Sequence, residues 1–210
     1  MTKSESTSSP KSPPGRGPRE RLIETAAELF YRQGYSVTGI NQIIAESGTH
    51  KASFYRYFET KEDLAQAYLE LRGEYFREFL GRLIGRSASI EEFAQTWVKL
   101  TLREVRQNRF FGCPLANFRG QIESPDDRQA HALQRIISEW LALLTEFLRT
   151  TRTHGATPRD PAPEVLAVRF LKIYEGSVQL YRMTDDVAYL RSMADEMVDA
   201  ARRPTSTQRA

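Results

Sequence analysis

The chain has 210 residues, and 40% of them are hydrophobic, which is enough for a buried core in one large domain or in a small domain joined to a larger one. The formal net charge of +3 and the pI near 9.0 are mildly basic, so binding to a polyanion would need a local cationic patch. The single cysteine, Cys113, excludes an intrachain disulfide and fits a reducing compartment. No apolar run approaches the roughly 18 residues of a membrane span. We therefore expect a cytoplasmic protein with no membrane partner.

The two ends of the chain differ from its middle. Residues 1–18 are dominated by serine, proline and cations, and they carry too little apolar surface to offset the entropy of ordering. They predict a disordered basic arm, and residues 204–210 are assigned to a tail. Between them we expect one helical domain over 19–60 and a larger helical domain over 61–203.

The first domain shows the pattern of one longer helix followed by two short ones. The longer helix begins at Arg19, and Gly34 stands in the position that closes a helix. We expect Thr38 to cap the first short helix and Gly48 to break it. The second short helix is expected from about 50 to 57. The apolar residues that define the longer helix and the first short helix are Leu22, Ile23, Ala26, Leu29, Phe30, Ile40, Ile43 and Ile44.

The second domain opens with Thr60-Lys61-Glu62-Asp63, which has the spacing of a capping box. The long helix that follows has its apolar register at Leu64, Tyr68, Leu71, Tyr75, Phe79 and Leu83. Ser89 and Ser124 are placed as caps of later helices, and the proline-containing segment 150–163 is expected to be a loop. Further helices are expected over 90–106, after Pro114, and over 126–150, 164–183 and 185–201. Because no segment alternates with a period of two, the predicted fold class is all-α.

Two short helices around a glycine turn are typical of a helix-turn-helix, whose second helix lies in the major groove of DNA. Lys51, Ala52 and Ser53 stand at the start of that helix, where side chains meet base edges. Lysine can donate to guanine, alanine can contact a thymine methyl, and serine can donate or accept. These three residues are the predicted base-reading positions.

Phosphate contacts are expected from side chains around the same helix. Lys61 combines its own charge with exposed amides at a helix start, and Thr38 has a similar position one helix earlier. His50 could cap the helix, contact a phosphate or titrate near neutral pH, and we favour a phosphate or structural role. Phe54 and Phe58 are four apart and are expected to pack under the first helix. The other expected phosphate contacts are Tyr55, Arg56 and Tyr57.

This arrangement resembles the signature of TetR/AcrR-type transcriptional repressors over roughly residues 19–65. The departures are Gly39, Thr49 and His50, where the family commonly has a small hydroxyl or β-branched residue, an apolar residue, and a capping serine or threonine. They leave the operator sequence open. The matching pattern is Thr38-x4-Ile43-x4-Gly48-x6-Tyr55-x-Tyr57-Phe58-x2-Lys61-x2-Leu64.

The resemblance implies that the first three helices bind DNA and that the remaining helices form a bundle for effector binding and dimerisation, with the last two at the dimer interface. It implies a homodimer that represses by binding a palindromic double-stranded operator and that a small-molecule effector releases. No cofactor or metal is expected. The arm could follow the DNA backbone or enter a minor groove, or it could be a passive solubilising tail.

The dimer is also expected from the residues themselves. The segment 164–183 is apolar around so much of its circumference that one domain core cannot cover it, and a two-fold mate would supply a second apolar surface. The residues predicted at this interface are Val168, Leu171, Val178, Leu190, Met193 and Met197.

The effector pocket can be predicted only by chemistry, because such cavities mix aromatic side chains with a few polar groups. Simple packing is the alternative for each candidate. The segment 111–117 resembles one found in a subset of these repressors, which supports a pocket wall there, and Cys113 is expected to be a buried small hydrophobe rather than a redox sensor. The pocket candidates are Trp97, Phe111, Asn117, Phe118, Trp140 and Tyr174.

Two other classes of protein compete with a regulator. Catalysis is disfavoured, because the histidines at 50, 131 and 154 are scattered and no nucleophile elbow, phosphate-binding loop or paired metal ligands occur. The second alternative is a helical protein–protein interaction module without sequence-specific DNA binding. Salt-sensitive binding to specific against random duplex DNA would separate the regulator from that module.

Overall fold

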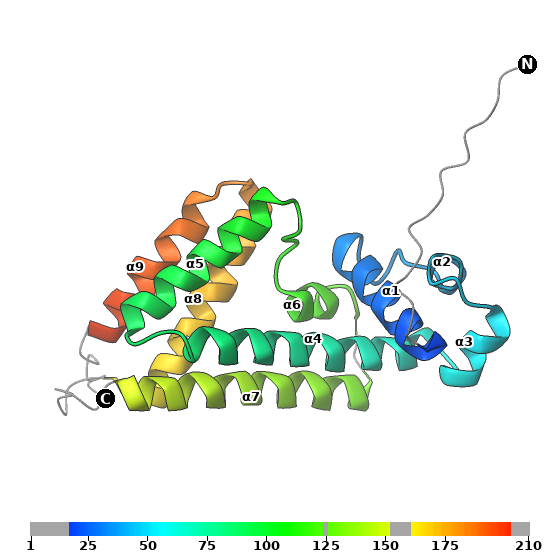
Figure 1. The fold of residues 1–210 in the computed structure, drawn as a ribbon, viewed down its shortest axis with the longest axis horizontal. Coiled ribbons are helices and arrows are strands. Elements are labelled where there is room, and N and C mark those ends of the chain that lie inside the picture. The colour runs from blue at the N-terminus through cyan, green and yellow to red at the C-terminus, as the bar shows by residue number, and fades with distance from the viewer. Residues whose placement is uncertain (1–16, 124–125, 152–160, 203–210) are drawn as a thin grey trace, which may run out of the picture.

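The computed structural model describes residues 17–123, 126–151 and 161–202, and these residues form nine α-helices and no strand (Figure 1). The predicted all-α fold class is therefore confirmed for the described residues. Most of the predicted arm, the tail at 204–210, Ser124 and most of the predicted 150–163 loop lie outside them. None of the helices in the described part of the chain is long and apolar enough to cross a membrane.

Helices α1 (Pro18–Arg32), α2 (Ile40–Glu46) and α3 (Lys51–Tyr57) form a small head at one end of the molecule (Figure 1). Gly34 follows α1 with φ +107°, and Gly48 follows α2 with φ +61°, so both turns use backbone geometry that glycine adopts most easily. The buried side chains of the three helices belong to the main apolar core. They include Leu22, Ala26, Phe30, Ile43, Phe54 and Phe58.

The head differs from the prediction at the start of α2. Gly39 is the N-cap residue, so the prediction that Thr38 caps this helix is wrong. Thr38 is 1% exposed, and its hydroxyl donates to the carbonyl of Gly34 at 2.6 Å. The hydroxyl is satisfied inside the turn that joins α1 to α2, which is why it does not act as a cap.

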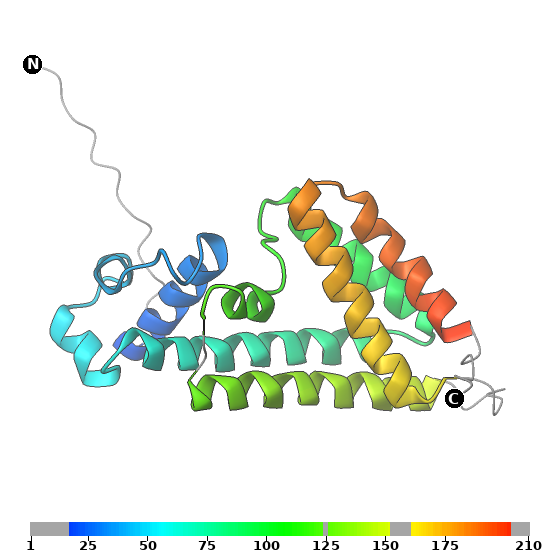
Figure 2. The same cartoon turned by 180° about the vertical axis from the view of Figure 1, so that it is seen from behind.

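Helix α4 (Lys61–Ile84) runs from the head along the body and lies beside α7 (Asp127–Thr151) (Figures 1 and 2). Its predicted capping box is confirmed: the amide of Asp63 donates to the Thr60 hydroxyl at 3.1 Å, and the Thr60 amide donates to the Asp63 carboxylate at 3.0 Å. The predicted register is wrong at Tyr75, which is 45% exposed, because it lies on the side of α4 that faces away from the core.

The rest of the body consists of α5 (Ile90–Arg106), α6 (Pro114–Arg119), α8 (Pro163–Thr184) and α9 (Ala188–Arg202). Helix α9 packs against both α5 and α8, and α6 lies on α4 next to the head (Figure 2). The predicted cap at Ser89 is confirmed, since its hydroxyl accepts from the Glu92 amide at 3.1 Å.

The contact between α4 and α7 depends on a close backbone approach at Gly73. A Cβ atom at this position would lie 2.8 Å from Cγ1 of Ile136 on α7. The carbonyl of Gly73 also accepts a hydrogen bond from Trp140 Nε1 at 3.3 Å, and Trp140 is fully buried. The missing side chain therefore lets the two longest helices approach and satisfies the indole of the α7 tryptophan.

Gly73→Ala is expected to lower the free energy of unfolding by about 1–3 kcal/mol, because the added methyl overpacks against Ile136. Gly81→Ala in the same helix is the matched control, since a Cβ there meets nothing within 4 Å. The control should gain about 0.5–1 kcal/mol from the higher helix propensity of alanine. Urea unfolding at one fixed protein concentration measures both effects. Equal effects would contradict the close approach at Gly73.

Candidate nucleic-acid interface and ligand cavity

The outer surface of α3 carries most of the predicted DNA-contacting side chains. Lys51, Ala52, Tyr55, Arg56 and Tyr57 are exposed, and Ser53 is half-buried. The inner side of the helix is formed by Phe54 and Phe58, which are 0% and 4% exposed, so their predicted packing role is confirmed. The helix therefore presents a polar, cationic surface and is anchored from below by two aromatic rings, while the DNA contacts themselves stay predictions.

The cations of α3 are held against its tyrosines. The Lys51 ammonium lies 6.0 Å from the centroid of the Tyr55 ring, and the Arg56 guanidinium lies 4.7 Å from that of Tyr57. Arg56 also donates to the Tyr57 hydroxyl at 2.8 Å. Because an aromatic ring limits the freedom of each cation, the Arg56–Tyr57 pair can meet a phosphate with less loss of side-chain entropy.

The residues before α3 explain how the departures from the family pattern are accommodated. His50 is the exposed N-cap residue, but its side chain makes no capping hydrogen bond. Thr49 is 9% exposed, and its hydroxyl pairs with that of Ser47 at 2.8 Å. A threonine is tolerated at this buried position because its polar atom has a partner.

The Lys61 side chain is bound within the protein, whereas a side chain that only contacts phosphate would be free. Its ammonium donates to the backbone carbonyl of Tyr35 at 2.6 Å and lies 4.1 Å from the centroid of the Tyr35 ring. Burial lowers the pKa of Lys61. The lysine therefore fixes the start of α4 to the head, and any phosphate contact would be made from this anchored position.

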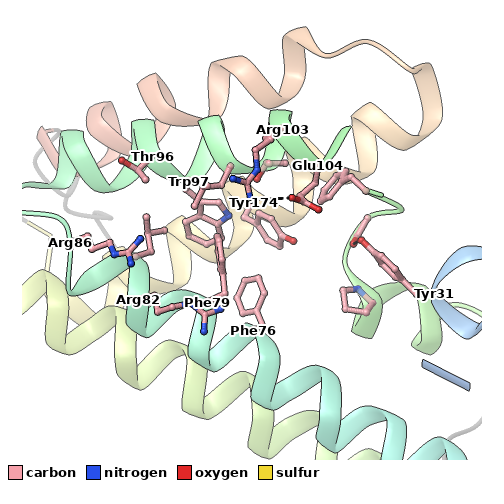
Figure 3. Close-up of a pocket in the computed structure, with 16 residues that line it drawn as sticks. Tyr31, Phe76, Phe79, Arg82, Arg86, Thr96, Trp97, Arg103, Glu104 and Tyr174 are labelled. Atoms are coloured by element: carbon pink, nitrogen blue, oxygen red, sulfur yellow. Dashed lines mark hydrogen bonds and ion pairs between the residues drawn. The ribbon is translucent and has the colours of Figure 1, made fainter. Parts of the chain in front are cut away.

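The body contains a cavity of about 490 Å³ between α4, α5, α8 and the loop before α6 (Figure 3). Its walls are mostly aromatic and aliphatic, and several arginines and hydroxyl groups reach it. Volume and lining are those of a pocket for a drug-sized organic molecule. The aromatic lining residues are Tyr31, Phe76, Phe79, Trp97, Phe110 and Tyr174.

Two of the six predicted pocket residues, Trp97 and Tyr174, line this cavity. Phe111 and Asn117 instead line smaller or more open hollows beside it. Asn117 is occupied in tying the loop, because it donates to the Phe111 carbonyl at 2.7 Å and accepts a hydrogen bond from Arg182.

The predictions for Phe118 and Trp140 as lining residues of this cavity are wrong. Phe118 packs edge-on against Tyr35 at 4.9 Å between ring centroids, inside the core next to the head. Trp140 lies behind the cavity wall, with its ring centroid 4.0 Å from that of Phe76. Sequence reasoning missed Phe76, Phe79 and the cavity arginines, because the helical register shows that a side chain is buried but not whether its neighbour is a cavity.

A hydrogen-bonded link joins the head to the cavity wall. The Tyr31 hydroxyl, on α1, donates to the Gly112 carbonyl at 3.0 Å and accepts from the Phe111 amide at 3.1 Å. Ser36, also in the head, bonds to Gln121 through its amide at 3.1 Å and its hydroxyl at 2.9 Å. The segment on both sides of α6 is thus attached to the head.

Cys113 lies in this linking segment and is 1% exposed, so its predicted role as a buried small hydrophobe is confirmed. Burial, with a further contribution from Glu175, raises the pKa of the Cys113 thiol well above its ordinary value. The thiolate is the reactive species in cysteine oxidation, so this environment does not favour a redox sensor.

The predicted role at the dimer interface is wrong for four of the six residues, because Val178, Leu190, Met193 and Met197 are fully buried within the protomer. The packing of α9 between α5 and α8 already covers them. Val168 is 38% exposed and Leu171 is partly buried. The exposed large apolar side chains on α8 and α9 are Val165, Val168, Leu180, Met183 and Tyr189.

Helices α2 and α3, with the glycine turn between them, have the arrangement of a helix-turn-helix whose second helix is free to enter a groove. By fold and surface chemistry, the molecule is a helix-turn-helix DNA-binding protein with a cavity-containing helical body. Two family models match it: "Bacterial regulatory proteins, tetR family" over residues 22–68, and "Tetracyclin repressor-like, C-terminal domain" over residues 88–197.

Several curated regulators are similar along most of the chain. LmrA of Bacillus subtilis (strain 168) is 30% identical, over 71% of this chain and 81% of LmrA. The transcriptional repressor DhaR of Mycobacterium sp. (strain GP1) is 27% identical, over 76% of this chain and 80% of DhaR. The chain belongs to the TetR family of bacterial regulatory proteins, and it is a DNA-binding transcriptional regulator. The family predicted from the helix-turn-helix residues is thereby confirmed.

Solved structures agree on the fold. The reduced form of NemR from E. coli has a TM-score of 0.77 at 19% identity, covering 90% of this chain and 100% of NemR. The regulatory protein TetR from Rhodobacter sphaeroides has a TM-score of 0.76 at 22% identity, covering 86% of this chain and 97% of that chain. At these identities the likeness establishes a shared fold.

Tyr31→Phe tests the link between head and cavity wall, because it keeps the ring and removes both hydrogen bonds. We expect the free energy of unfolding to fall by about 1–2 kcal/mol and the Phe111 amide to exchange faster. Urea unfolding and hydrogen exchange measure the two effects. Tyr75→Phe is the control, since its exposed hydroxyl bonds to no described residue. Unchanged exchange at Phe111 would show that the hydroxyl does not hold the loop.

Proposed function

We propose that this regulator is a repressor that binds a palindromic operator as a homodimer and that a small molecule in the 490 Å³ cavity releases it. The observation that carries the proposal is the hydrogen-bonded attachment of the DNA-binding head to the wall of that cavity through Tyr31. The relative DhaR is named a repressor, which supports repression rather than activation. Lys51, Ala52 and Ser53 read bases in this scheme, and the neighbouring tyrosines and cations hold phosphates.

Dimerisation is proposed through the exposed apolar face of α8 and α9. The side chains of Val165, Val168 and Leu180 are 43%, 38% and 39% exposed, and Met183 is 71% exposed. A second copy related by a two-fold axis would cover this face and place two copies of α3 on one side. Two reading helices roughly 34 Å apart meet successive major grooves, which is the reason that a palindromic site is expected.

Release is proposed to act through α4 and the Phe111–Pro114 loop. The cavity is lined by α4, by Gly112 and Pro114 of the loop, and also by Tyr31 of the head, so an occupant contacts the head and the body together. An effector that shifts α4 or this loop changes the separation of the two reading helices. Linkage requires that operator DNA lowers effector affinity by the same factor.

The proposal includes action in the cytoplasm, where an operator is accessible, and no catalytic role, because regulators of this kind act by binding. The deciding experiment is selection of bound duplexes from random DNA with the purified chain. Enrichment of an inverted repeat bound by two protomers, with affinity that falls steeply with salt, supports the proposal. Equal affinity for all duplexes would favour the protein–protein interaction module instead.

Lys51→Ala and Lys61→Ala should affect DNA binding in different ways. Losing the base contact of Lys51 should reduce the preference for operator over random duplex by roughly 5- to 100-fold. Losing Lys61 should weaken binding to both duplexes alike and reduce the slope of log affinity against log salt by about 1. Fluorescence anisotropy over a range of salt concentrations measures both quantities.

Lys99→Ala, an exposed lysine of α5 in the body, is the matched control and should change neither quantity. Because Lys61 also binds the Tyr35 carbonyl, its variant is compared only after thermal unfolding shows a folded head. Loss of operator preference in Lys61→Ala, with preference intact in Lys51→Ala, would reverse the roles assigned here.

A further inference from the structure

Two buried hydroxyl groups line the cavity without a hydrogen-bond partner among the described residues. Tyr174 is 4% exposed and Thr101 is 6% exposed, and neither hydroxyl hydrogen-bonds to another described residue. Figure 3 shows the Tyr174 ring among the cavity aromatics, with its hydroxyl directed into the open space. Burial raises the pKa of Tyr174 well above its ordinary value, so the group stays protonated and can donate. A buried donor of this kind selects a cavity occupant that has an acceptor atom.

The cavity lining is cationic. Arg82 in the last turn of α4, Arg86 just beyond that helix and Arg103 on α5 line it, and Glu104 is the one acid among the described lining residues. Figure 3 shows Arg82 and Arg86 at one end of the aromatic cluster and Tyr31 at the other. A single cation near the end of α4 is common for any helix, but here Arg82 and Arg86 lie together at one end of the cavity, and Arg103 lines it separately from α5.

The charges of these arginines are only partly balanced. The Glu104 carboxylate is already engaged by Arg109, through two contacts of 3.0 Å each, and Arg103 lies 3.5 Å from it. Arg82 is paired with Glu78 at 3.2 Å. Arg86 forms no ion pair with any residue that the structure describes, so it is the cation most available to an anionic occupant.

The interior between these polar groups suits flat rings. The Tyr174 ring lies 5.0 Å from that of Trp97 and 5.7 Å from that of Phe76, with interplanar angles of 33° and 45°. The cavity volume of about 490 Å³ accommodates a molecule of two or three fused rings. Aromatic side chains on several sides favour an aromatic over a purely aliphatic occupant.

We propose that the effector is an aromatic organic anion, with its rings against the cavity-facing surfaces of Phe76, Trp97 and Tyr174 and its carboxylate or equivalent acceptor group at the Arg82–Arg86 end of the cavity. The Tyr174 hydroxyl donates to a second acceptor atom on the same molecule. The proposal rests on the proposed function only in calling the occupant the effector, because the chemistry of the cavity stands without it.

Calorimetric titration of the full chain with matched compounds tests the class of occupant. The probes are 2-naphthoate and 2-anthroate, their primary amides, and the corresponding aminomethyl cations, with acetate as a control for ionic strength. At least one carboxylate is expected to bind about tenfold or more tightly than its amide, and the cation is expected to bind least tightly. The preference should shrink as salt is raised, because Arg82 and Arg86 are solvent-exposed.

Two conservative variants locate the contacts. Arg86→Met should reduce the preference for carboxylate over amide by about threefold or more, while Arg191→Met, an exposed arginine on α9, should leave it unchanged. Tyr174→Phe keeps the ring contacts and should weaken carboxylate binding by about fivefold. Circular dichroism and thermal unfolding confirm that each variant is folded before its affinities are compared.

The outcome separates this proposal from the proposed function. If operator binding is intact but the amides bind as tightly as the carboxylates, or no carboxylate binds at 1 mM, which is about −4 kcal/mol, the anionic class is wrong and the regulator stands. If the carboxylates bind as expected but neither operator selection nor ligand-dependent release is observed, the cavity chemistry stands and the repressor mechanism is wrong.

Discussion

The Tyr31 hydroxyl is the contact through which head and body depend on each other. It bonds to two consecutive residues of the loop, accepting from the Phe111 amide and donating to the Gly112 carbonyl. The ring itself is held between Phe111, at 5.3 Å between centroids, and the Arg72 guanidinium of α4, at 4.9 Å. One side chain of α1 thus contacts both elements that form the near wall of the cavity, so α1 cannot rotate against the body without disturbing that wall.

Helix α4 provides a second, stiffer connection. The capping box at Thr60 and the Lys61 contact to the Tyr35 carbonyl fix its first turn in the head. At its other end, Arg82 in the last turn and Arg86 just beyond the helix line the cavity. Between these ends, Gly73 allows close packing on α7, so the helix is supported along its length. In the proposed mechanism, a displacement at the cavity is therefore transmitted as movement of a rigid element, whereas a flexible linker would absorb it.

The parts of the fold that could be predicted are those set by local chemistry. Thr60 and Ser89 bind the amides of their own helices, and the glycines at 34 and 48 adopt positive φ, so helix starts and turns follow from neighbouring residues. Burial against distant elements could not be predicted in the same way. Val178 and Leu190 have the apolar character of interface residues, but α9 packs between α5 and α8 and covers them. The cavity aromatics pose the same problem, because Phe76 and Trp140 are neighbours in the core and only one of them faces open space.

A ligand can change DNA affinity only if it binds two arrangements of head and body with different free energies. In the proposed mechanism the cavity provides this difference, because its lining includes Tyr31 and Gly112, the two ends of the same hydrogen bond. An occupant that displaces the loop breaks both bonds to the Tyr31 hydroxyl, each worth roughly 0.5–1.5 kcal/mol net. Their sum lies within the 1–3 kcal/mol or so that typical allosteric coupling requires. The proposed release mechanism can thus draw its energy from one tyrosine and two backbone groups, without unfolding any helix.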